Sequence, residues 1–345
     1  MMIPVIMNTS FERLAEIDDY ISFIWTNRYY TAGDFELCVI ANAENMALLQ
    51  KWYYVVRDDD ENVGIIEHLV VQHDEESGNV IVVSGRFLPS ILGRRIIAVQ
   101  TNVSGAISSC VNKLINENVI SPTIAARQIS NFILGSYEFS KTMYAQYTGD
   151  NLLDTISAIC ETYGLGFKVT LNDQHQFVFQ LYQGVDHTYD QSTNPYVIFS
   201  DEYDNLLSSE YEENYAEMVT AVLVAGEGEG LNRKTMWVSD GATGINRCEL
   251  YKDQRDLQSN DGEIPTAEYD EILQEKGKEL LTTYTAAFTG EVFMNNVEYR
   301  KDVNVGDLVV IENKKLGIYM NTRLVEVIES MSETGEYSTV PTFGV

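Results

Sequence analysis

Val305-Gly306-Asp307-Leu308-Val309-Val310-Ile311 is followed by Leu316-Gly317-Ile318-Tyr319 and then by Thr322-Arg323-Leu324-Val325-Glu326-Val327-Ile328. Each stretch is a short apolar pattern typical of a β-strand, and the residues between them suit tight turns. These three patterns lie within the last 47 residues, Tyr299 to Val345. The pattern predicts that this end of the chain curls into a small barrel or sandwich.

The length and charge of the chain limit what it can be. With 345 residues, 45% of them hydrophobic, it is long enough for two to four globular domains. Its 52 acidic and 23 basic residues give a formal net charge of -29. Such a balance disfavours binding of nucleic acid through a basic surface. Most of this charge is expected to be solvated surface, although some of it could face a passage through which a polyanion slides without sticking.

No stretch of the sequence predicts a membrane span, a secretory signal or a disulfide framework. No window approaches the roughly 20 apolar residues that a membrane helix needs. The start, Met1 to Met7, has no basic residue before its apolar run, so we expect a strand there. The four cysteines form no C-x-x-C pair, and Cys110 and Cys160 fall on apolar helix faces. We expect those two to be reduced core residues.

Residues 1–98 read as an N-terminal antiparallel β domain. Phe35, Leu37 and Val39 alternate with polar neighbours, which predicts a strand with one buried face. The acidic run at residues 58–62 predicts a solvated hairpin tip, and the long apolar run at 63–71 predicts strand pairing after it.

Residues 99–190 predict a smaller α+β domain of helices and a hairpin. One amphipathic helix is expected after a cap at Ser104, and a second after Ser121-Pro122 that continues to Ile133. A third is expected over 152–163, ended by Gly164. Alternation on either side of residues 172–174 predicts a hairpin packed on this helix.

A second β region follows. Residues 191–258 include strand patterns at 196–199, 219–225 and 236–238. A helix from about 266 to 284 is expected within residues 259–284, and residues 285–345 form the terminal β region. The strands of 191–258 have no complete sheet of their own. We therefore expect 191–258 and 285–345 to form one discontinuous barrel with the helix inserted between them.

The histidines, the acidic clusters and the glycine-rich run of the sequence match no catalytic motif. His68 and His73 would point to opposite faces of a strand, His175 falls in a turn, and His187 beside Asp186 has no nucleophile motif to serve. The cluster Glu210, Glu212, Glu213 and Glu217 is read as a solvated face, and the glycine-rich run 226–230 lacks the lysine of a phosphate loop. A metal site at Asp186, Asp190, Asp201 or Asp204 stays open, although their spacing does not match a calcium loop.

Several short motifs spread along the chain, in order, resemble the Gp37-like family of siphophage tail proteins, which is similar to the hub proteins of tail tips and baseplates. These motifs are Gly33-Asp34-Phe35-Glu36-Leu37-Cys38-Val39, Gly64-Ile65-Ile66-Glu67, Ser84-Gly85-Arg86, Leu92-Gly93-Arg94-Arg95-Ile96-Ile97, Gly184-Val185-Asp186, Val197-Ile198-Phe199-Ser200, Asp204-Asn205-Leu206, Val305-Gly306-Asp307, Thr322-Arg323-Leu324 and Pro341-Thr342-Phe343-Gly344. One departure is His187, where the family pattern leads us to expect arginine.

The resemblance implies a mainly β fold with an α+β insert and two tail-tube-like barrels, in a homotrimeric, non-enzymatic hub. Such a hub adapts a sixfold tail tube to a threefold spike or fibre and contacts distal tail or baseplate proteins. It implies a place in the virion tail, with assembly in the host bacterial cytoplasm, and an acidic lumen would let DNA pass. A phage, a prophage and a headless contractile bacteriocin would use it alike.

We expect no cofactor, no metal and no catalytic residue in such a hub. Gly33, Gly64, Gly306 and Gly317 are expected at structural turns, and Arg86, Arg94, Arg95 and Arg323 in ion pairs between strands or subunits. Tyr29-Tyr30 suits either an interface or a half-buried strand. The alternative function is a tail-associated cell-wall hydrolase, an endopeptidase or a muramidase, and an adhesin is a third hypothesis.

Overall fold

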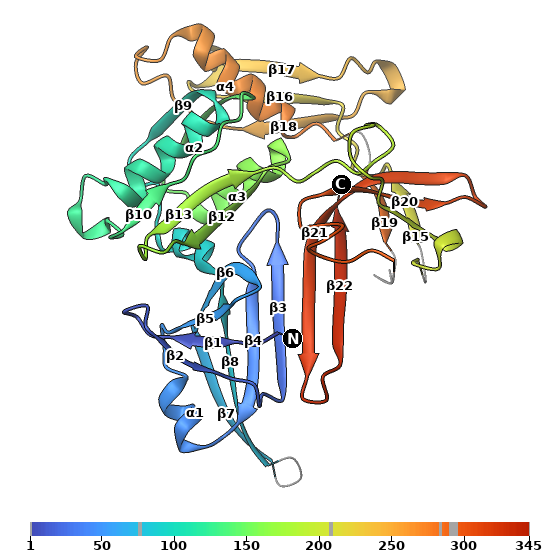
Figure 1. The fold of residues 1–345 in the computed structure, drawn as a ribbon. Helices are drawn as coiled ribbons and strands as arrows, with labels where there is room; N and C mark the ends of the chain where they lie inside the picture. Colours follow the sequence, from blue (N-terminus) through green and yellow to red (C-terminus); the bar gives the residue numbers. More distant parts are fainter. Residues whose placement is uncertain (1, 75–77, 207–209, 283–284, 290–295, 345) are drawn as a thin grey trace.

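The computed structural model of the chain describes residues 2–74, 78–206, 210–282, 285–289 and 296–344. It has 41% of its residues in strands and 20% in helices, so the predicted mainly β class is confirmed. Strands from the N-terminal and C-terminal regions lie side by side in one part of the molecule, and the helices at 107–115, 152–163 and 266–278 lie in another (Figure 1).

The largest sheet has eight strands and combines strands of the N-terminal region with strands of the C-terminal region. Its order is β14-β20-β21-β3-β4-β8-β7, with β22 paired to β21. The strands are β3 (Ser22–Arg28), β4 (Asp34–Ile40), β7 (His68–Asp74), β8 (Gly78–Arg86), β14 (Ile198–Ser200), β20 (Leu308–Asn313), β21 (Ile318–Ser332) and β22 (Tyr337–Gly344). Residues 318–323 of β21 pair with β20, and residues 326–332 pair with β3. The first and last regions, expected as separate barrels, thus share one sheet, and within the described residues no sheet closes into a barrel.

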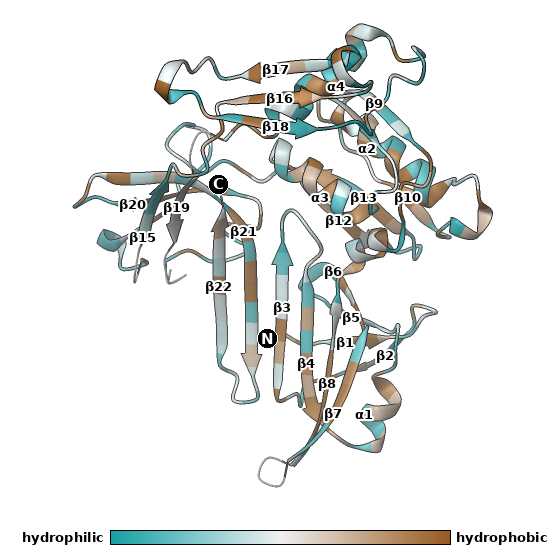
Figure 2. Ribbon diagram, turned by 180° about the vertical axis from the view of Figure 1, so that it is seen from behind, coloured by the Kyte–Doolittle hydropathy of each residue, from teal (hydrophilic) through white to brown (hydrophobic). Residues whose placement is uncertain are grey.

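The alternation predicted for residues 35–39 is confirmed in β4. Phe35, Leu37 and Val39 are buried and Glu36 is exposed. Hydrophobic and hydrophilic residues alternate along this strand (Figure 2). The buried side chains of β3 and β4 form one core with apolar residues of a second, four-stranded sheet.

That second sheet has the order β2-β1-β5-β6. Its elements are β1 (Val5–Met7), β2 (Arg13–Glu16), β5 (Tyr54–Arg57) and β6 (Asp60–Ile65), and α1 (Ala43–Leu48) precedes β5. The strand expected at the start of the chain is confirmed by β1. The apolar run at 63–71 divides between β6 and β7, which belong to different sheets because β6 pairs with β5 and β7 with β8.

The middle of the chain is an α+β unit that includes two of the three predicted helices. Its elements are η1 (Leu88–Arg94), β9 (Thr101–Ala106), α2 (Ile107–Ile115), the π-turn η2 (Asn116–Ile120), η3 (Ala125–Arg127), β10 (Phe132–Leu134), β11 (Thr142–Tyr147), α3 (Leu152–Tyr163), β12 (Gly166–Leu171) and β13 (Phe177–Tyr182). The hairpin β12–β13 and the helix α3 before it are confirmed. Asn151 caps α3 at its start, and Gly164, at φ +66°, ends it.

The first predicted helix is present as α2, but the cap predicted for it and the whole second helix were wrong. Ser104 does not cap a helix, because it lies in β9 paired with Tyr144 of β11, and α2 begins only at Ile107. The helix expected after Ser121 is absent: that segment contains only the short turn η3 and then β10, whose Phe132 pairs with Phe177 of β13. The apolar spacing at 125–133 fits the period of a helix and also that of a strand. The segment forms a strand because it can pair with the free edge of β13.

Residues 221–278 form a small unit of their own. The three-stranded sheet β17-β16-β18 consists of β16 (Ala221–Ala225), β17 (Thr235–Ser239) and β18 (Glu249–Asp253), and α4 (Thr266–Lys278) packs on it. The strands expected near 219–225 and 236–238 are confirmed, and they form a sheet separate from β20–β22, with α4 packed on their apolar face. The short elements are η4 (Asp201–Tyr203), η5 (Gly230–Asn232), η6 (Gly244–Asn246), β15 (Glu210–Asn214) and β19 (Thr285–Thr289), and β15 pairs with β19.

Candidate functional site

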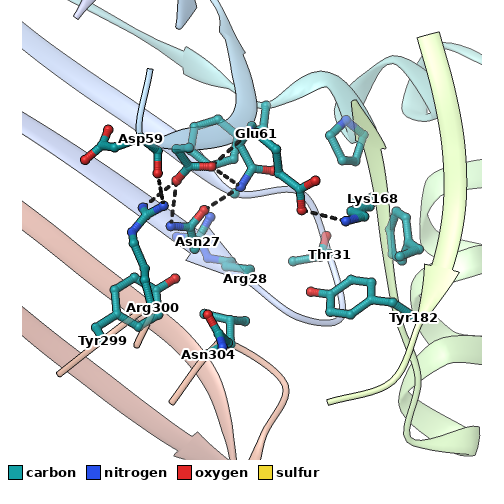
Figure 3. Close-up of a pocket in the computed structure, with 17 residues that line it drawn as sticks. Asn27, Arg28, Thr31, Asp59, Glu61, Lys168, Tyr182, Tyr299, Arg300 and Asn304 are labelled. Atoms are coloured by element: carbon teal, nitrogen blue, oxygen red, sulfur yellow. Dashed lines mark hydrogen bonds and ion pairs between the residues drawn. The ribbon is translucent and has the colours of Figure 1, made fainter. Parts of the chain in front are cut away.

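A network of four charged side chains, three of them buried, joins the N-terminal and C-terminal regions. Arg57 Nη1 lies 3.2 Å from Glu329 Oε2, and Arg300 Nη2 lies 2.5 Å from Asp60 Oδ2 and also contacts Glu329. The side chains of Arg57, Glu329 and Asp60 are only 1%, 2% and 3% exposed. Figure 3 shows Arg300 reaching from the C-terminal region to the segment that carries Asp59. The network therefore ties β5 and β6 to β21.

Local structure explains why these charges meet. Glu329 of β21 lies opposite Trp25 of β3 in the strand register, and Trp25 Nε1 donates to Asp60 Oδ2 at 2.8 Å. Arg57 follows a bulge in the β5–β6 pairing, and its guanidinium lies 5.6 Å from the Trp25 ring centroid. The acidic hairpin tip is thus not wholly solvated as predicted, because Asp60 turns inward to meet the indole and Arg300.

The carboxylates of this network keep its two arginines charged, and we call the four side chains the clamp. Burial alone would lower the pKa of Arg57, but its hydrogen bond with Asp59 and the charge of Glu329 outweigh burial and raise that pKa. Burial would lower the pKa of Arg300 too, and Asp60 and Glu329 raise it instead. Both arginines stay charged, and their ion pairs hold β5 and β6 against β21.

A polar cavity of about 380 Å³ lies beside this network. It is lined by residues from the N-terminal sheets, the α+β unit and the C-terminal region, among them Asn27, Arg28, Glu61, Lys168, Tyr182 and Asn304. Lys168 Nζ bonds Glu61 Oε1 at 2.6 Å across it. The cavity marks the meeting point of all three regions.

A second junction forms around the buried ring of Tyr29. Its hydroxyl donates to the carbonyl of Gly164 at 3.2 Å and accepts from the backbone N–H of Gly184, also at 3.2 Å. Burial raises the pKa of Tyr29. The guanidinium of Arg323 lies 5.1 Å from the ring centroid and donates to the carbonyl of Gly306. Tyr29 thus links β3 to the α+β unit and the C-terminal strands.

His187 stands at the position where arginine was expected, and it contacts Asp307. Its Nε2 lies 3.5 Å from Asp307 Oδ2, and its Nδ1 lies 2.7 Å from the carbonyl oxygen of Pro195. Asp307 also accepts backbone hydrogen bonds from Val185 at 2.6 Å and Asn304 at 2.7 Å. Burial raises the pKa of Asp307 against these hydrogen bonds.

The four glycines fall into two groups. Gly306, at φ +102°, and Gly317, at φ +68°, lie in turns and adopt the left-handed region that favours glycine. Gly64 lies within β6 and not in a turn, and a Cβ there would sit 2.4 Å from the Phe35 ring. Gly33 likewise has no positive φ, and a Cβ there would meet the carbonyl oxygen of Thr26 at 2.1 Å. Close packing requires glycine at these last two positions.

The four arginines expected in ion pairs all make contacts within the same chain. Arg86 and Arg94 both contact Glu67, at 2.8 and 3.3 Å. Burial would raise the pKa of Glu67, but the hydrogen bond from Arg86 and the charge of Arg94 lower it. Arg323 bonds a backbone carbonyl and no carboxylate among the described residues. Arg95 donates to the carbonyls of Arg127 and Arg94, at 2.7 and 2.9 Å.

Other candidate groups do not converge on one centre. His68 and His73 lie in β7, and the His175 ring stacks 5.0 Å from Phe11. In the part of the chain that the structure describes, no group of three or more His, Cys, Asp or Glu residues is placed to hold a metal. Cys110 and Cys160 are buried free thiols, as predicted. Of the described helices, none is both long and apolar enough to cross a membrane.

Sequence reasoning missed the clamp formed by Arg57, Asp60, Arg300 and Glu329. One signal was present: Val327, Glu329 and Met331 alternate along β21, which places the carboxylate on the buried face. The pairing of Glu329 with Arg57, 272 residues away, had no local signal.

Comparison with known proteins agrees with this architecture. A family model described as Siphovirus ReqiPepy6 Gp37-like protein matches residues 3–345. The tail protein from Neisseria meningitidis MC58 has a TM-score of 0.60 at 14% identity, covering 99% of this chain and 96% of that chain. The prophage tail protein gp18 from Listeria monocytogenes EGD-e has a TM-score of 0.57 at 12% identity, covering 99% and 94%. The 43 kDa tail protein of prophage MuSo2 from Shewanella oneidensis has a TM-score of 0.57 at 14% identity, covering 98% and 97%.

At these identities the likeness shows a shared fold. No curated protein sequence matches the chain significantly. The family resemblance expected from the motifs is confirmed over nearly the whole chain. The alternative of a cell-wall hydrolase is not favoured by these comparisons.

Proposed function

The chain belongs to the Siphovirus ReqiPepy6 Gp37-like protein family, and from this premise we propose that it is a structural, non-enzymatic hub of a phage tail tip or baseplate. The observation that carries this proposal is the family match over residues 3–345, together with a fold shared over nearly the whole chain with three tail proteins, two of them described as prophage proteins. Its place is then the virion tail.

The buried contacts between the three regions of the chain suit a protein that transmits force. β3 and β21 share a sheet, and Arg57 and Arg300 hold the same junction through Glu329. Tyr29 anchors the α+β unit to this sheet. A connector must transmit force between its neighbours without hinging, and three regions tied through buried contacts resist such bending.

We propose further that three copies form a ring that adapts a sixfold tail tube to a threefold spike or fibre. Two tube-like domains per copy would supply six units to the ring, one built on residues 1–98 and one on 191–258 with 285–345. The α+β domain at 99–190 and the helical segment at 259–284 would lie outside the tube. Partners are the tail tube protein, distal tail or baseplate proteins, and the spike or fibre.

The stoichiometry can be measured on tail tips released from purified particles. Native mass spectrometry should find three copies of the chain in the subassembly that also contains the tube protein. One or two copies would overturn the adaptor geometry.

The strong negative charge has a use in this setting. With 52 acidic residues against 23 basic ones, a ring whose lumen is lined by carboxylates would repel DNA and let it pass. A reconstruction of the assembled ring tests this, because a neutral or basic lumen would contradict it.

A further inference from the structure

The charge of the chain is unevenly distributed. Residues 86–149 hold six basic residues and only two acidic ones, although the whole chain has a net charge of -29. The six are Arg86, Arg94, Arg95, Lys113, Arg127 and Lys141. Acidic segments of a second copy of the chain would be attracted to this basic region.

Two arginines in this region have no carboxylate partner among the described residues. Arg95 donates only to the carbonyls of Arg127 and Arg94, and Arg127 donates to the Ile96 carbonyl and, at 3.2 Å, to Asn118 Oδ1. Both side chains are half-buried. Burial, and then the like charges of Arg127 and Arg94, lower the pKa of Arg95. Cations held together in this way are stabilised by an incoming anion.

An apolar cleft adjoins these arginines. It has a volume of about 220 Å³, enough for one large side chain, and Arg94 and Arg95 stand at its rim. Its apolar lining includes Trp52, Ile91, Ile129 and Phe177. Trp52 is 40% exposed and has the guanidinium of Arg94 4.6 Å from its ring centroid. An aromatic and arginine-rich pocket is the usual form of an interface anchor site.

The chain itself contains a segment of complementary chemistry. All five residues of β15 are exposed, and three of them are glutamates that flank or follow Tyr211. Tyr211 and Tyr215 are 37% and 54% exposed, and both hydroxyls donate to Glu213, at 2.6 and 3.1 Å. Since side chains two apart share a face of a strand, Tyr211 and Glu213 lie on one face of β15. Tyr215 follows the strand directly and donates to the same carboxylate, so the three side chains form one acidic and aromatic group.

The two surfaces lie on opposite flanks of the molecule. β15 lies at one side, and α2 and β10, between which Arg127 lies in the sequence, lie at the other in both views (Figures 1 and 2). Complementary patches on opposite flanks cannot meet within one chain and generate a head-to-tail contact, which closes into a ring when the rotation allows.

We propose that the cleft lined by Arg94 and Arg95, together with Arg127 beside Arg95, binds the β15 face of a second copy of this chain. An aromatic ring of β15 fills the apolar cleft, and Glu213 supplies the carboxylate that Arg95 and Arg127 lack. This inference rests on the proposed ring and names the surfaces that would build it.

Sedimentation velocity of the full chain over a range of concentrations tests this contact. The wild type should self-associate, and added salt should weaken it. Arg95→Glu with Arg127→Glu, and Glu213→Arg alone, should each weaken association at least about tenfold. The triple variant should recover part of the loss, because the reversed charges attract again. Lys141→Glu is the matched control in the same basic region and should associate as the wild type does.

Each other result overturns the contact. A wild type that stays monomeric, a Glu213→Arg chain that associates normally, or a Lys141→Glu chain that is equally weakened would all contradict it. Circular dichroism of every variant verifies the fold, and Glu213 lies on an exposed strand where substitution leaves the core intact. The tail-tip assignment is tested separately, by the position of the chain in the particle, so either can fail alone.

Discussion

Replacing Glu329 by glutamine should destabilise the protein strongly. Glu329 is 2% exposed and accepts from both Nη atoms of Arg57, at 3.2 and 3.3 Å, from Arg300, and from the Tyr337 hydroxyl at 3.0 Å. Glutamine keeps the shape but removes the charge, which leaves Arg57 buried with only the half-exposed Asp59 as an ionic partner. Removing one partner of a buried pair costs about 3–5 kcal/mol. Because Arg57 keeps Asp59 and Arg300 keeps Asp60, we expect a loss of about 3 kcal/mol.

Urea denaturation, followed by tryptophan fluorescence, measures this loss directly because Trp25 lies against the network. Glu298→Gln is the matched control: its ion pair with Lys301 is solvent-exposed, so its unfolding midpoint should stay unchanged. The double variant Arg57→Met with Glu329→Leu should recover much of the stability, since apolar residues can replace a buried ion pair. Equal midpoints for Glu329→Gln and Glu298→Gln would refute the clamp.

Three further outcomes are expected. Gly306→Ala should lower the melting temperature far more than Gly317→Ala. Both substitutions add the strain of a left-handed backbone, about 1–2 kcal/mol. Only at Gly306 would the new Cβ fall 2.2 Å from the buried Tyr29 ring, whereas at Gly317 it meets open space. Because the folded pKa of Glu67 is lowered, its contribution to stability is present above its usual pKa of 4.5 and lost as the pH falls through the lowered value, so Arg86→Gln should flatten the acid end of a stability profile. Burial raises the pKa of Cys110 to about 11, so iodoacetamide at pH 8 should label it only after denaturation, and rapid labelling of the native protein would contradict its burial.

Local patterns in the sequence predicted the elements with a strong period and clear ends. The alternation of Phe35, Leu37 and Val39 predicted β4, and Gly164 marked the end of α3. Where the period was ambiguous, tertiary pairing decided, as at Phe132, which extends the β13 sheet as a strand. Propensity and periodicity describe one segment at a time and cannot report a free sheet edge elsewhere in the chain.

The candidate site was less predictable because its parts lie far apart in sequence. The glycine at 306 and the arginine at 323 were singled out, and they do meet at the Tyr29 junction. Gly64 was assigned to a turn because glycine suits turns, but the Phe35 ring above β6 is the reason for it. The pairing of β3 with β21, and with it the clamp at Glu329, depends on long-range register that no local pattern encodes.

The central claim is that this chain is a structural part of a phage tail, located at its tip. Electron microscopy of purified particles, with a gold-labelled antibody against the chain, tests it most directly. We expect gold at the tail end farthest from the head in intact particles. Labelling along the whole tail or at the head, or a chain missing from purified particles, would contradict the claim.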